Sequence, residues 1–408
     1  MYERKYGKGG LAVMTKPFND VRSMQSLYSK MVGWRRHLHR HPELSYEEKQ
    51  TSHYIAEQLR AMGCEPVTDV GGHGVTVLIQ GEKPGPVVAL RADIDALPIQ
   101  DRKQVDYIST VPGVMHACGH DAHTATLLGV AKYYMDNCSH IAGARKLIFQ
   151  PAEEITPGGA LPMIREGVLE DVDAIYGVHL WTPLPLGTVA SKAGPFMAAP
   201  DEFYIEITGR GGHAGIPHET VDAIIIGSAL VGALQTIVSR NVNPLEPAVL
   251  SVGSFQAGST TNVIAETAYL RGTVRTFNPQ TRALIRKRME EIIEQTCTMY
   301  GGKGVLDYRE GYPAVVNEAS EIDRFFSVGS EILPKEQVQE SGLIMAGEDF
   351  SYYLQQRKGC FMFVGAGNPD KGANYPHHHP MFDLDEDAML ISANLLIGMA
   401  ENYAGNPD

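Results

Sequence analysis

One short stretch of the sequence concentrates residue types that bind metals or carry out catalysis. Met115 to Thr124, MHACGHDAHT, places one cysteine and three histidines close together. Imidazole and thiolate are ligands for zinc and related divalent metals, and a cysteine near a histidine is also typical of a nucleophilic thiol. A lone cysteine such as Cys118 is more often a small buried apolar residue. The stretch is therefore compatible with a metal site, a nucleophilic cysteine or a polar loop. Residues elsewhere in the sequence are needed to distinguish these three interpretations.

The elements that would position these residues indicate an α/β domain. Runs of β-branched and aliphatic residues predict strands at Val87–Ile94, Lys146–Gln150 and Ala174–His179, and a helical pattern covers Ala122–Met135. Strands that alternate with helices favour a mostly parallel central sheet flanked by helices. Further elements are predicted at Met24–Met62 (helix, interrupted at His41 and Pro42), Asn317–Leu333 (helix), Cys360–Gly365 (strand) and Asp385–Tyr403 (helix).

The pattern changes near Ala199 and predicts an inserted domain. Glu202–Thr208 alternates between apolar and polar residues, which indicates a strand with one buried face. The segments that follow predict a helix, two strands, a helix and a strand at Thr220–Arg240, Ala248–Phe255, Glu266–Phe277, Pro279–Tyr300 and Val305–Glu310. This β-α-β-β-α-β order is ferredoxin-like. We therefore predict a large domain of residues 1–198 and 314–408, with an α+β domain of residues 199–313 inserted into it.

Chemically active residues follow the predicted strands of the large domain. Asp95 follows the first strand, Glu153 and Glu154 follow the second, and His179 ends the third. Cys118 and His120 stand just before a helix, and a loop after the last strand holds three consecutive histidines, His377, His378 and His379. Ligands of open α/β sheets bind outside the carboxyl ends of the strands. We therefore expect these side chains to meet at one edge of the sheet.

These residue types together predict a metal centre more strongly than any one of them does alone. Imidazole and carboxylate suit zinc, manganese, cobalt or nickel, and a thiolate adds a soft ligand. Several ligands with spare carboxylates suit two metals that share a bridging water, with a further carboxylate to take the proton of that water. Glu153 and Glu154 would supply the base and a ligand. Simpler roles are also open: His123 as a packing residue, Asp121 as a helix N-cap and the histidine triplet as a solvated turn.

Composition narrows the class of protein. The 408 residues carry 35 basic and 48 acidic side chains, a net charge of −13, which disfavours binding to nucleic acid. No apolar run approaches the roughly 20 residues that span a bilayer, and the N-terminal segment lacks a secretion signal. The five cysteines lie far apart, which argues against a disulfide framework. We expect a cytoplasmic enzyme with no membrane partner.

Many segments resemble the dimetal aminoacylase and carboxypeptidase family. Within that family, the sequence is similar to the amidohydrolase subgroup, which includes hippurate hydrolases, indole-acetyl-amino-acid hydrolases and N-acetyl-amino-acid deacetylases. The matching segments are RRHLHRHPELSYEE, ALRADIDALPI, MHACGHDAHTATLLG, QPAEE, GVHLW, GRGGHAG, TNVIAE, RGTVRTF, MAGEDFSYYL and HHHPMFD, from Arg35 to Asp383. The resemblance implies that two divalent metals, Mn, Zn, Ni or Co, support hydrolysis of an N-acyl amino acid to a carboxylic acid and a free amino acid.

The resemblance also implies roles for single residues. The metal ligands would be Cys118, His120, Glu154, His179 and His378, the last because the subgroup pattern His-x-Pro falls on it. Glu153 would be the general acid and base, and Asp95 would support the site. Asp93 stands where many relatives have a histidine and is not assigned as a ligand. Ile155, Thr156 and Pro157 replace glycines that often follow the tandem glutamates, so the pocket rim departs from the family pattern.

The inserted domain would be a lid or dimerisation domain on the same resemblance. His213 would stabilise the oxyanion, reaching an active site across a homodimer or higher homo-oligomer. Asn262 would hold polar groups of the small-molecule substrate, and Arg275 would bind its carboxylate. Without the resemblance, His213 and Asn262 could be turn residues and Arg275 an exposed strand residue.

Three other functions remain open from the sequence. One is a dipeptidase or carboxypeptidase of the same fold. A second is a thiol enzyme that uses Cys118 as nucleophile, and a third is a non-catalytic protein that binds a small ligand. The tandem Glu153 and Glu154 disfavour the third, because a binding protein needs no base.

Overall fold

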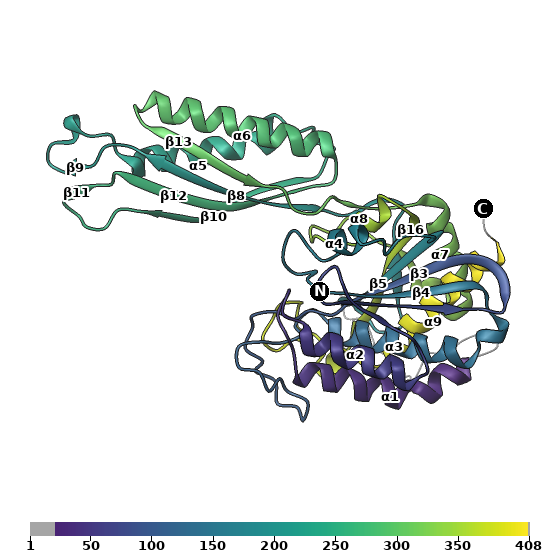
Figure 1. The fold of residues 1–408 in the computed structure, drawn as a ribbon. Helices are drawn as coiled ribbons and strands as arrows, with labels where there is room; N and C mark the ends of the chain where they lie inside the picture. The colour runs from purple at the N-terminus through teal and green to yellow at the C-terminus, as the bar shows by residue number, and fades with distance from the viewer. Residues whose placement is uncertain (1–20, 407–408) are drawn as a thin grey trace. The chain divides into compact units, whose positions relative to one another are not determined.

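The structure is a computed structural model that describes residues 21–406 (Figure 1). The N-terminal segment in which no secretion signal was recognised lies outside the described residues. Chain contacts divide the protein into two compact units. Unit 1 comprises residues up to Gly194, Val316–Gly342 and the residues from Tyr352 onward, and unit 2 comprises Pro195–Val315 and Leu343–Ser351.

Unit 1 is built on an eight-stranded sheet with the order β1-β2-β4-β3-β5-β16-β6-β15. Its strands are β1 (Val67–Val70), β2 (Gly74–Gln80), β3 (Lys83–Asp93), β4 (Ala142–Gln150), β5 (Ala174–Pro185), β6 (Val189–Ser191), β15 (Val338–Glu340) and β16 (Lys358–Gly367). The four central strands, β4, β3, β5 and β16, are parallel. The predicted α/β class with a mostly parallel sheet is therefore confirmed.

The parallel register brings the carboxyl ends of β3 and β4 level with His179 in β5. Asp93 of β3 pairs with Gln150 of β4, while Arg91 pairs with Gly177 of β5. His179, two residues beyond Gly177, pairs with Phe363 of β16. The segments after β3 and β4 therefore begin level with His179. Strands β5 and β16 continue beyond it to Pro185 and Gly367, so the prediction that the third strand ends at His179 is wrong.

Helices cover this sheet and form a continuous core with it. The helices of unit 1 are α1 (Val21–Arg40), α2 (Lys49–Ala61), α3 (His120–Asp136), α4 (Ala160–Arg165), α7 (Ala319–Ile332), α8 (Ser351–Leu354) and α9 (Ala388–Gly405). In Figure 1, α1, α2 and α3 lie on one side of the sheet and α4 on the other. Small residues let α1 and α3 approach closely, since a Cβ at Gly129 would lie 2.9 Å from Met31 Sδ.

Unit 2 has the predicted β-α-β-β-α-β order. It consists of β8 (Ala199–Thr208), α5 (Ala223–Arg240), β10 (Ala248–Ala257), β12 (Thr267–Thr276), α6 (Pro279–Met299) and β13 (Lys303–Arg309). The antiparallel sheet has the order β10-β12-β8-β13. Alternate residues of β8 are buried with residues of α5 and α6, as the sequence pattern predicted. A two-stranded ribbon, β9 (Gly212–His213) with β11 (Val263–Ile264), completes the unit.

Short strands β7 (Gly194–Met197) and β14 (Val315–Asn317) contain two of the points at which the chain passes from one unit to the other. The other two points follow Gly342 and Ser351. Within the described chain, α5 is the one helix that is long and apolar enough to cross a membrane by length and composition alone. The expectation of no membrane-spanning run is not contradicted, because α5 buries residues such as Ile226 and Leu230 in the core of unit 2. A single such helix is weak evidence, because core helices of other proteins pass the same test.

Candidate metal centre

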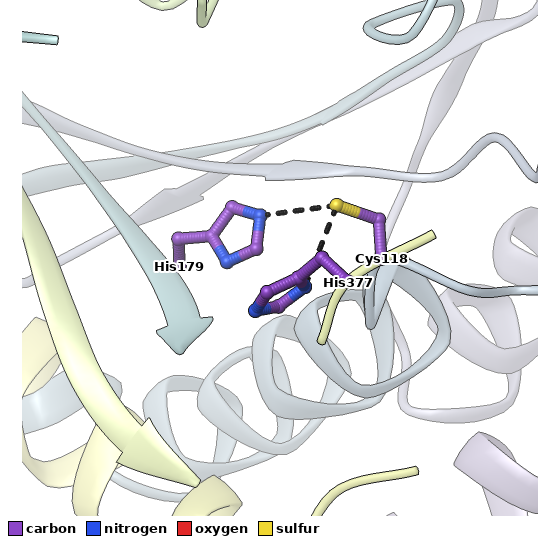
Figure 2. A group of neighbouring side chains, drawn as sticks. All are labelled: Cys118, His179 and His377. Carbon is purple, nitrogen blue, oxygen red and sulfur yellow. Dashed lines mark hydrogen bonds between the residues drawn. The ribbon is translucent and has the colours of Figure 1, made fainter. Parts of the chain in front are cut away.

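The residues predicted at the sheet edge meet around the thiol of Cys118. Its Sγ lies 3.4 Å from Nε2 of His179, at the level of the strand ends (Figure 2). One ligand atom each from Cys118, His120 and Glu154 lies within 4.8 Å of the others, and the same holds for Cys118, His179 and His377. Cys118 thus belongs to two neighbouring groups of potential ligands.

Backbone geometry places these side chains. Gly119 has φ 93°, a left-handed conformation that favours glycine, and α3 begins at the next residue. Ala152, just before Glu153, and His378 also have positive φ, at 52° and 65°. Non-glycine residues rarely adopt this conformation, and where they do the surrounding structure often serves a function.

Hydrogen bonds fix the imidazole of His120 in a form that can bind a metal. Nδ1 of His120 lies 3.0 Å from both the carbonyl oxygen and Oδ1 of Asp95, so it carries a proton and donates it. Asp95 is held in turn by the Ser45 hydroxyl and the Glu154 amide, which both donate to its Oδ2. A carboxylate behind a histidine is the usual support for a metal ligand. Nε2 of a neutral His120 is left with its lone pair.

The same reasoning applies to His179. Its Nδ1 lies 2.9 Å from the carbonyl oxygen of Leu180 and donates a proton to it. In the neutral ring, Nε2 then carries a lone pair that is directed at Cys118 (Figure 2). Burial holds the pKa of His179 well below its ordinary value, which keeps the ring neutral. His179 is therefore suited to be a ligand.

His123 has the opposite arrangement. The amide of Leu180 donates to its Nε2 at 2.9 Å, so its proton is on Nδ1, which donates to Oδ1 of Asp93 at 2.6 Å. Arg91 donates to Oδ2 of the same carboxylate at 2.7 Å. These hydrogen bonds engage both nitrogens of His123 and both oxygens of Asp93. Although the two residues lie beside His120, the bonds support leaving them out of the set of metal ligands.

Glu154 and His378 lie on the other side of His120. Oε1 of Glu154 is 3.8 Å from Nε2 of His120, and Oε2 is 3.4 Å from Nε2 of His378. The hydrogen bond with Glu154 raises the pKa of His378. Glu153, the neighbouring carboxylate, is buried with 7% of its surface exposed. A candidate ligand, Glu154, and a buried carboxylate, Glu153, are thus adjacent in the chain.

The chemistry of the donor set fits divalent metal ions. Within residues 21–406, the buried atoms Nε2 of His120 and Oε1 of Glu154 have no hydrogen-bond partner. Such groups are costly unless something binds them. Although burial alone would lower it, Asp93 and Asp95 raise the pKa of His120 to about 10, so the local field favours positive charge. A bound cation would satisfy both atoms and replace that proton.

The environment of Cys118 disfavours a role as free nucleophile. Burial and the nearby charges of Glu154 and Glu153 raise the pKa of the thiol well above its ordinary value. Reactive cysteines have a lowered pKa, whereas here burial and the two carboxylates outweigh the nearby start of α3. A metal ion would provide the positive charge that a thiolate needs at this position.

A buried ionic network behind the site was not foreseen from the residue types. Arg35 of α1 donates to Asp121 at 3.1 Å and also pairs with Asp383 and Glu386. His39 contacts the same oxygen of Asp121 at 2.7 Å. The interpretation of Asp121 as helix N-cap is wrong, because Gly119 is the cap and Asp121 faces α1. The network links the segment after His120 to the segment after the histidine triplet. Its sequence signal is that Arg35, Asp121 and Asp383 all lie in family-like segments.

Unit 2 holds the remaining predicted residues. His213 in β9 pairs with Val263 of β11, and the carbonyl oxygen of the adjacent Asn262 accepts a hydrogen bond from Ala214. His213 and Asn262 therefore lie together on the β9–β11 ribbon. Arg275 lies in β12, where its Nε donates to the carbonyl oxygen of Met345 and its Nη1 to that of Val274.

The carboxyl edge of this parallel sheet brings together thiol, imidazole and carboxylate groups, including two buried ligand atoms that have no hydrogen-bond partner within residues 21–406. This is the architecture of a metal-dependent hydrolase. Comparison with known proteins agrees and identifies the family. The model of peptidase family M20/M25/M40 matches residues 89–402. The chain belongs to this family and is a hydrolytic enzyme, so the resemblance seen in the sequence is confirmed.

Three relatives illustrate the range of the family. The chain is 45% identical to the N-acyl-L-amino acid amidohydrolase of Geobacillus stearothermophilus, over 72% of this chain and 80% of the relative. It is 40% identical to thermostable carboxypeptidase 2 of Saccharolobus solfataricus, over 92% and 95%. The crystal structure of the Bacillus subtilis YXEP protein, described as a dinuclear metal binding peptidase from the M20 family, matches with a TM-score of 0.80 and 33% identity, over 94% and 99%.

Proposed function

We propose that this protein is a metal-dependent amidohydrolase that cleaves N-acyl amino acids to a carboxylic acid and a free amino acid. The observation that carries the proposal is the convergence of Cys118, His120, Glu154 and His179, with two imidazole lone pairs directed into the group and Glu153 beside it. The Geobacillus stearothermophilus relative, named for this activity, supports the substrate class.

We assign five residues as ligands of two divalent ions: Cys118, His120, Glu154, His179 and His378. Cys118 lies within 4.8 Å of ligand atoms of His120 and Glu154 and also of His179, which supports a pair of ions rather than one. The donor types suit Mn, Zn, Ni or Co. When bound, such ions polarise the amide carbonyl and lower the pKa of water.

The remaining residues move protons and hold the substrate. Glu153 accepts a proton from the attacking water and then delivers it to the leaving amine nitrogen. Asp95 keeps His120 in its Nδ1-protonated form. Nδ1 of His213 accepts from the Gly215 amide, so its neutral ring carries the proton on Nε2 and can donate to an oxyanion. Asn262 and Arg275 hold the polar groups and the carboxylate of the substrate, as the resemblance implies.

The test is metal-dependent turnover. Metal-stripped protein receives Mn, Zn, Co or Ni and a panel of N-acetyl, N-benzoyl and N-indole-acetyl amino acids. We expect metal-restored release of free amino acid. Glu153→Gln should lower turnover by roughly 10²–10⁴-fold with unchanged metal content, while Glu82→Gln, an exposed carboxylate of unit 1, should not change it.

A dipeptidase or carboxypeptidase activity is the second candidate, favoured by the name of the Saccharolobus solfataricus relative. Faster cleavage of Gly-Leu-type dipeptides than of acyl amino acids would select it. Activity that survives exhaustive chelation would instead select the thiol mechanism of Cys118. Metal binding without turnover of any compound would select the non-catalytic protein.

We further propose that unit 2 is a lid and dimerisation domain and that the enzyme is a cytoplasmic homodimer or higher homo-oligomer. Strand β10 is at the edge of the unit 2 sheet, and the neighbouring α5 exposes Ile224 and Ile225. Edge strands and exposed apolar side chains are common at interfaces between copies. Sedimentation should show a dimer that Ile225→Asp converts to monomer, whereas Val305→Asp on β13 should not.

A further inference from the structure

His377 lies in a fixed position beside the sulfur of Cys118 (Figure 2). Its ring stacks on that of Trp181, with centroids 4.5 Å apart and planes 20° apart. Trp181 in turn stacks on Phe363 of β16, with centroids 4.7 Å apart. Because Trp181 and Phe363 belong to the central strands, this stack holds the His377 ring in one plane against the sheet.

The hydrogen bonds of His377 determine which nitrogen carries its proton. The Thr182 amide donates to Nε2 at 3.3 Å, so Nε2 must offer a lone pair. A neutral imidazole has one N–H group, which is then on Nδ1. Nδ1 is the atom that faces Cys118, at 3.8 Å from Sγ. His179 faces the same sulfur with the opposite tautomer, since its Nδ1 donates to a backbone carbonyl.

We infer that His377 is a positioning residue that donates its Nδ1–H group to the Cys118 sulfur and does not bind metal itself. This inference rests on the proposed metal centre, in which Cys118 binds as thiolate. A hydrogen bond to a thiolate withdraws electron density from the sulfur and fixes its lone pairs, as groups behind metal ligands generally do. Of three successive histidines, His377 would tune the thiolate while His378 binds metal.

The sulfur-to-metal charge-transfer band of the Co(II) protein reports on this hydrogen bond. Two variants separate the possible roles of the ring. His377→Phe keeps a ring that can stack on Trp181 and removes both nitrogens. His377→Asn places an amide N–H group near the position of Nδ1 and so restores a donor. His379→Phe is the matched control in the same loop, since His379 stacks on Tyr375 and its Nδ1 accepts from the Met381 amide.

We expect the wild-type protein to bind two Co(II) ions per chain and to show this band. In His377→Phe the band should move to lower energy with the cobalt content unchanged, since the sulfur electrons are no longer stabilised. The band should return towards its wild-type position in His377→Asn and stay in place in His379→Phe. Circular dichroism of each variant checks that it is folded.

Three results would overturn the inference. A band that stays in place in His377→Phe would mean that no hydrogen bond reaches the thiolate, and the metal centre itself would stand. Loss of one cobalt ion in His377→Phe and also in His377→Asn would make His377 a ligand. A folded wild-type protein that binds no cobalt, or binds it without a charge-transfer band, would refute the proposed metal centre and this inference with it.

Discussion

Glu48 offers a quantitative test of the electrostatics behind the site. Its side chain is fully buried, and its Oε1 accepts a hydrogen bond of 2.7 Å from the amide of Ala152, next to Glu153. Within the described residues, Oε2 has no hydrogen-bond partner. Burial and the charge of Asp95 raise the pKa of Glu48 from 4.5 to about 7.

The sign of the effect on stability follows from the two pKa values. Below pH 4.5 the carboxyl group is protonated in the folded and the unfolded chain. As the pH rises from 4.5 towards 7, the unfolded chain loses this proton first, so the free energy of unfolding falls. Each pKa unit is worth about 1.4 kcal/mol, so the loss reaches about 3 kcal/mol once the pH exceeds 7.

Glu48→Gln isolates this contribution because glutamine does not titrate and keeps an oxygen for the Ala152 amide. Denaturant unfolding of the metal-free protein at pH 5, 6, 7 and 8 gives the free energy of unfolding of each form. We expect the wild-type protein to lose most of the 3 kcal/mol relative to Glu48→Gln across this range. The exposed neighbour Glu47→Gln should follow the wild-type curve. A difference between wild type and Glu48→Gln that does not change with pH would refute the reasoning.

Three further predictions concern the buried network, unit 2 and the support of the site. Arg35→Met leaves buried carboxylates unpaired and should cost about 3–5 kcal/mol in denaturant unfolding. Arg36→Met, whose side chain is 36% exposed, should cost less than about 1 kcal/mol; equal costs would contradict the burial argument. Phe203→Ala empties the core of unit 2 and should cost about 3–5 kcal/mol by calorimetry, unlike the exposed Tyr269→Ala. Asp95→Ala releases the imidazole of a proposed ligand and should weaken metal binding about 10–100-fold in calorimetric titration; unchanged affinity would remove its supporting role.

Local patterns were sufficient to predict most of the elements. The β-branched run Val87–Ile94 corresponds to β3, and the small-residue helix Ala122–Met135 to α3. The alternation of Glu202–Thr208 correctly predicted a strand with one buried face, because that pattern depends on neighbours along the chain. Strands β1 and β2 were not among the predicted strands, although β2 contains the β-branched run Val75–Ile79.

The candidate site was only partly readable in the same way. The sequence by itself determined which residue types follow each strand, because strand ends and helix starts are local features. The rule that parallel strands present their carboxyl ends at one edge then placed Asp95, Glu154 and His179 close together. The family-like segments then narrowed the histidine triplet to His378.

The tertiary structure alone decided the state of each imidazole. His120, His123, His179 and His377 are chemically identical in the sequence, yet their rings differ in the structure. His120 and His179 direct a lone pair at the ligand group, His377 turns its Nδ1 to Cys118, and His123 donates to Asp93. The difference comes from which backbone amide or carbonyl lies beside each ring. The partner of His179 is the next residue, but the partners of the other three rings belong to segments distant in the chain, such as Leu180 for His123, so no spacing within a motif encodes them. The physical reason is that a hydrogen bond depends on position in space, whereas a sequence pattern records only order along the chain.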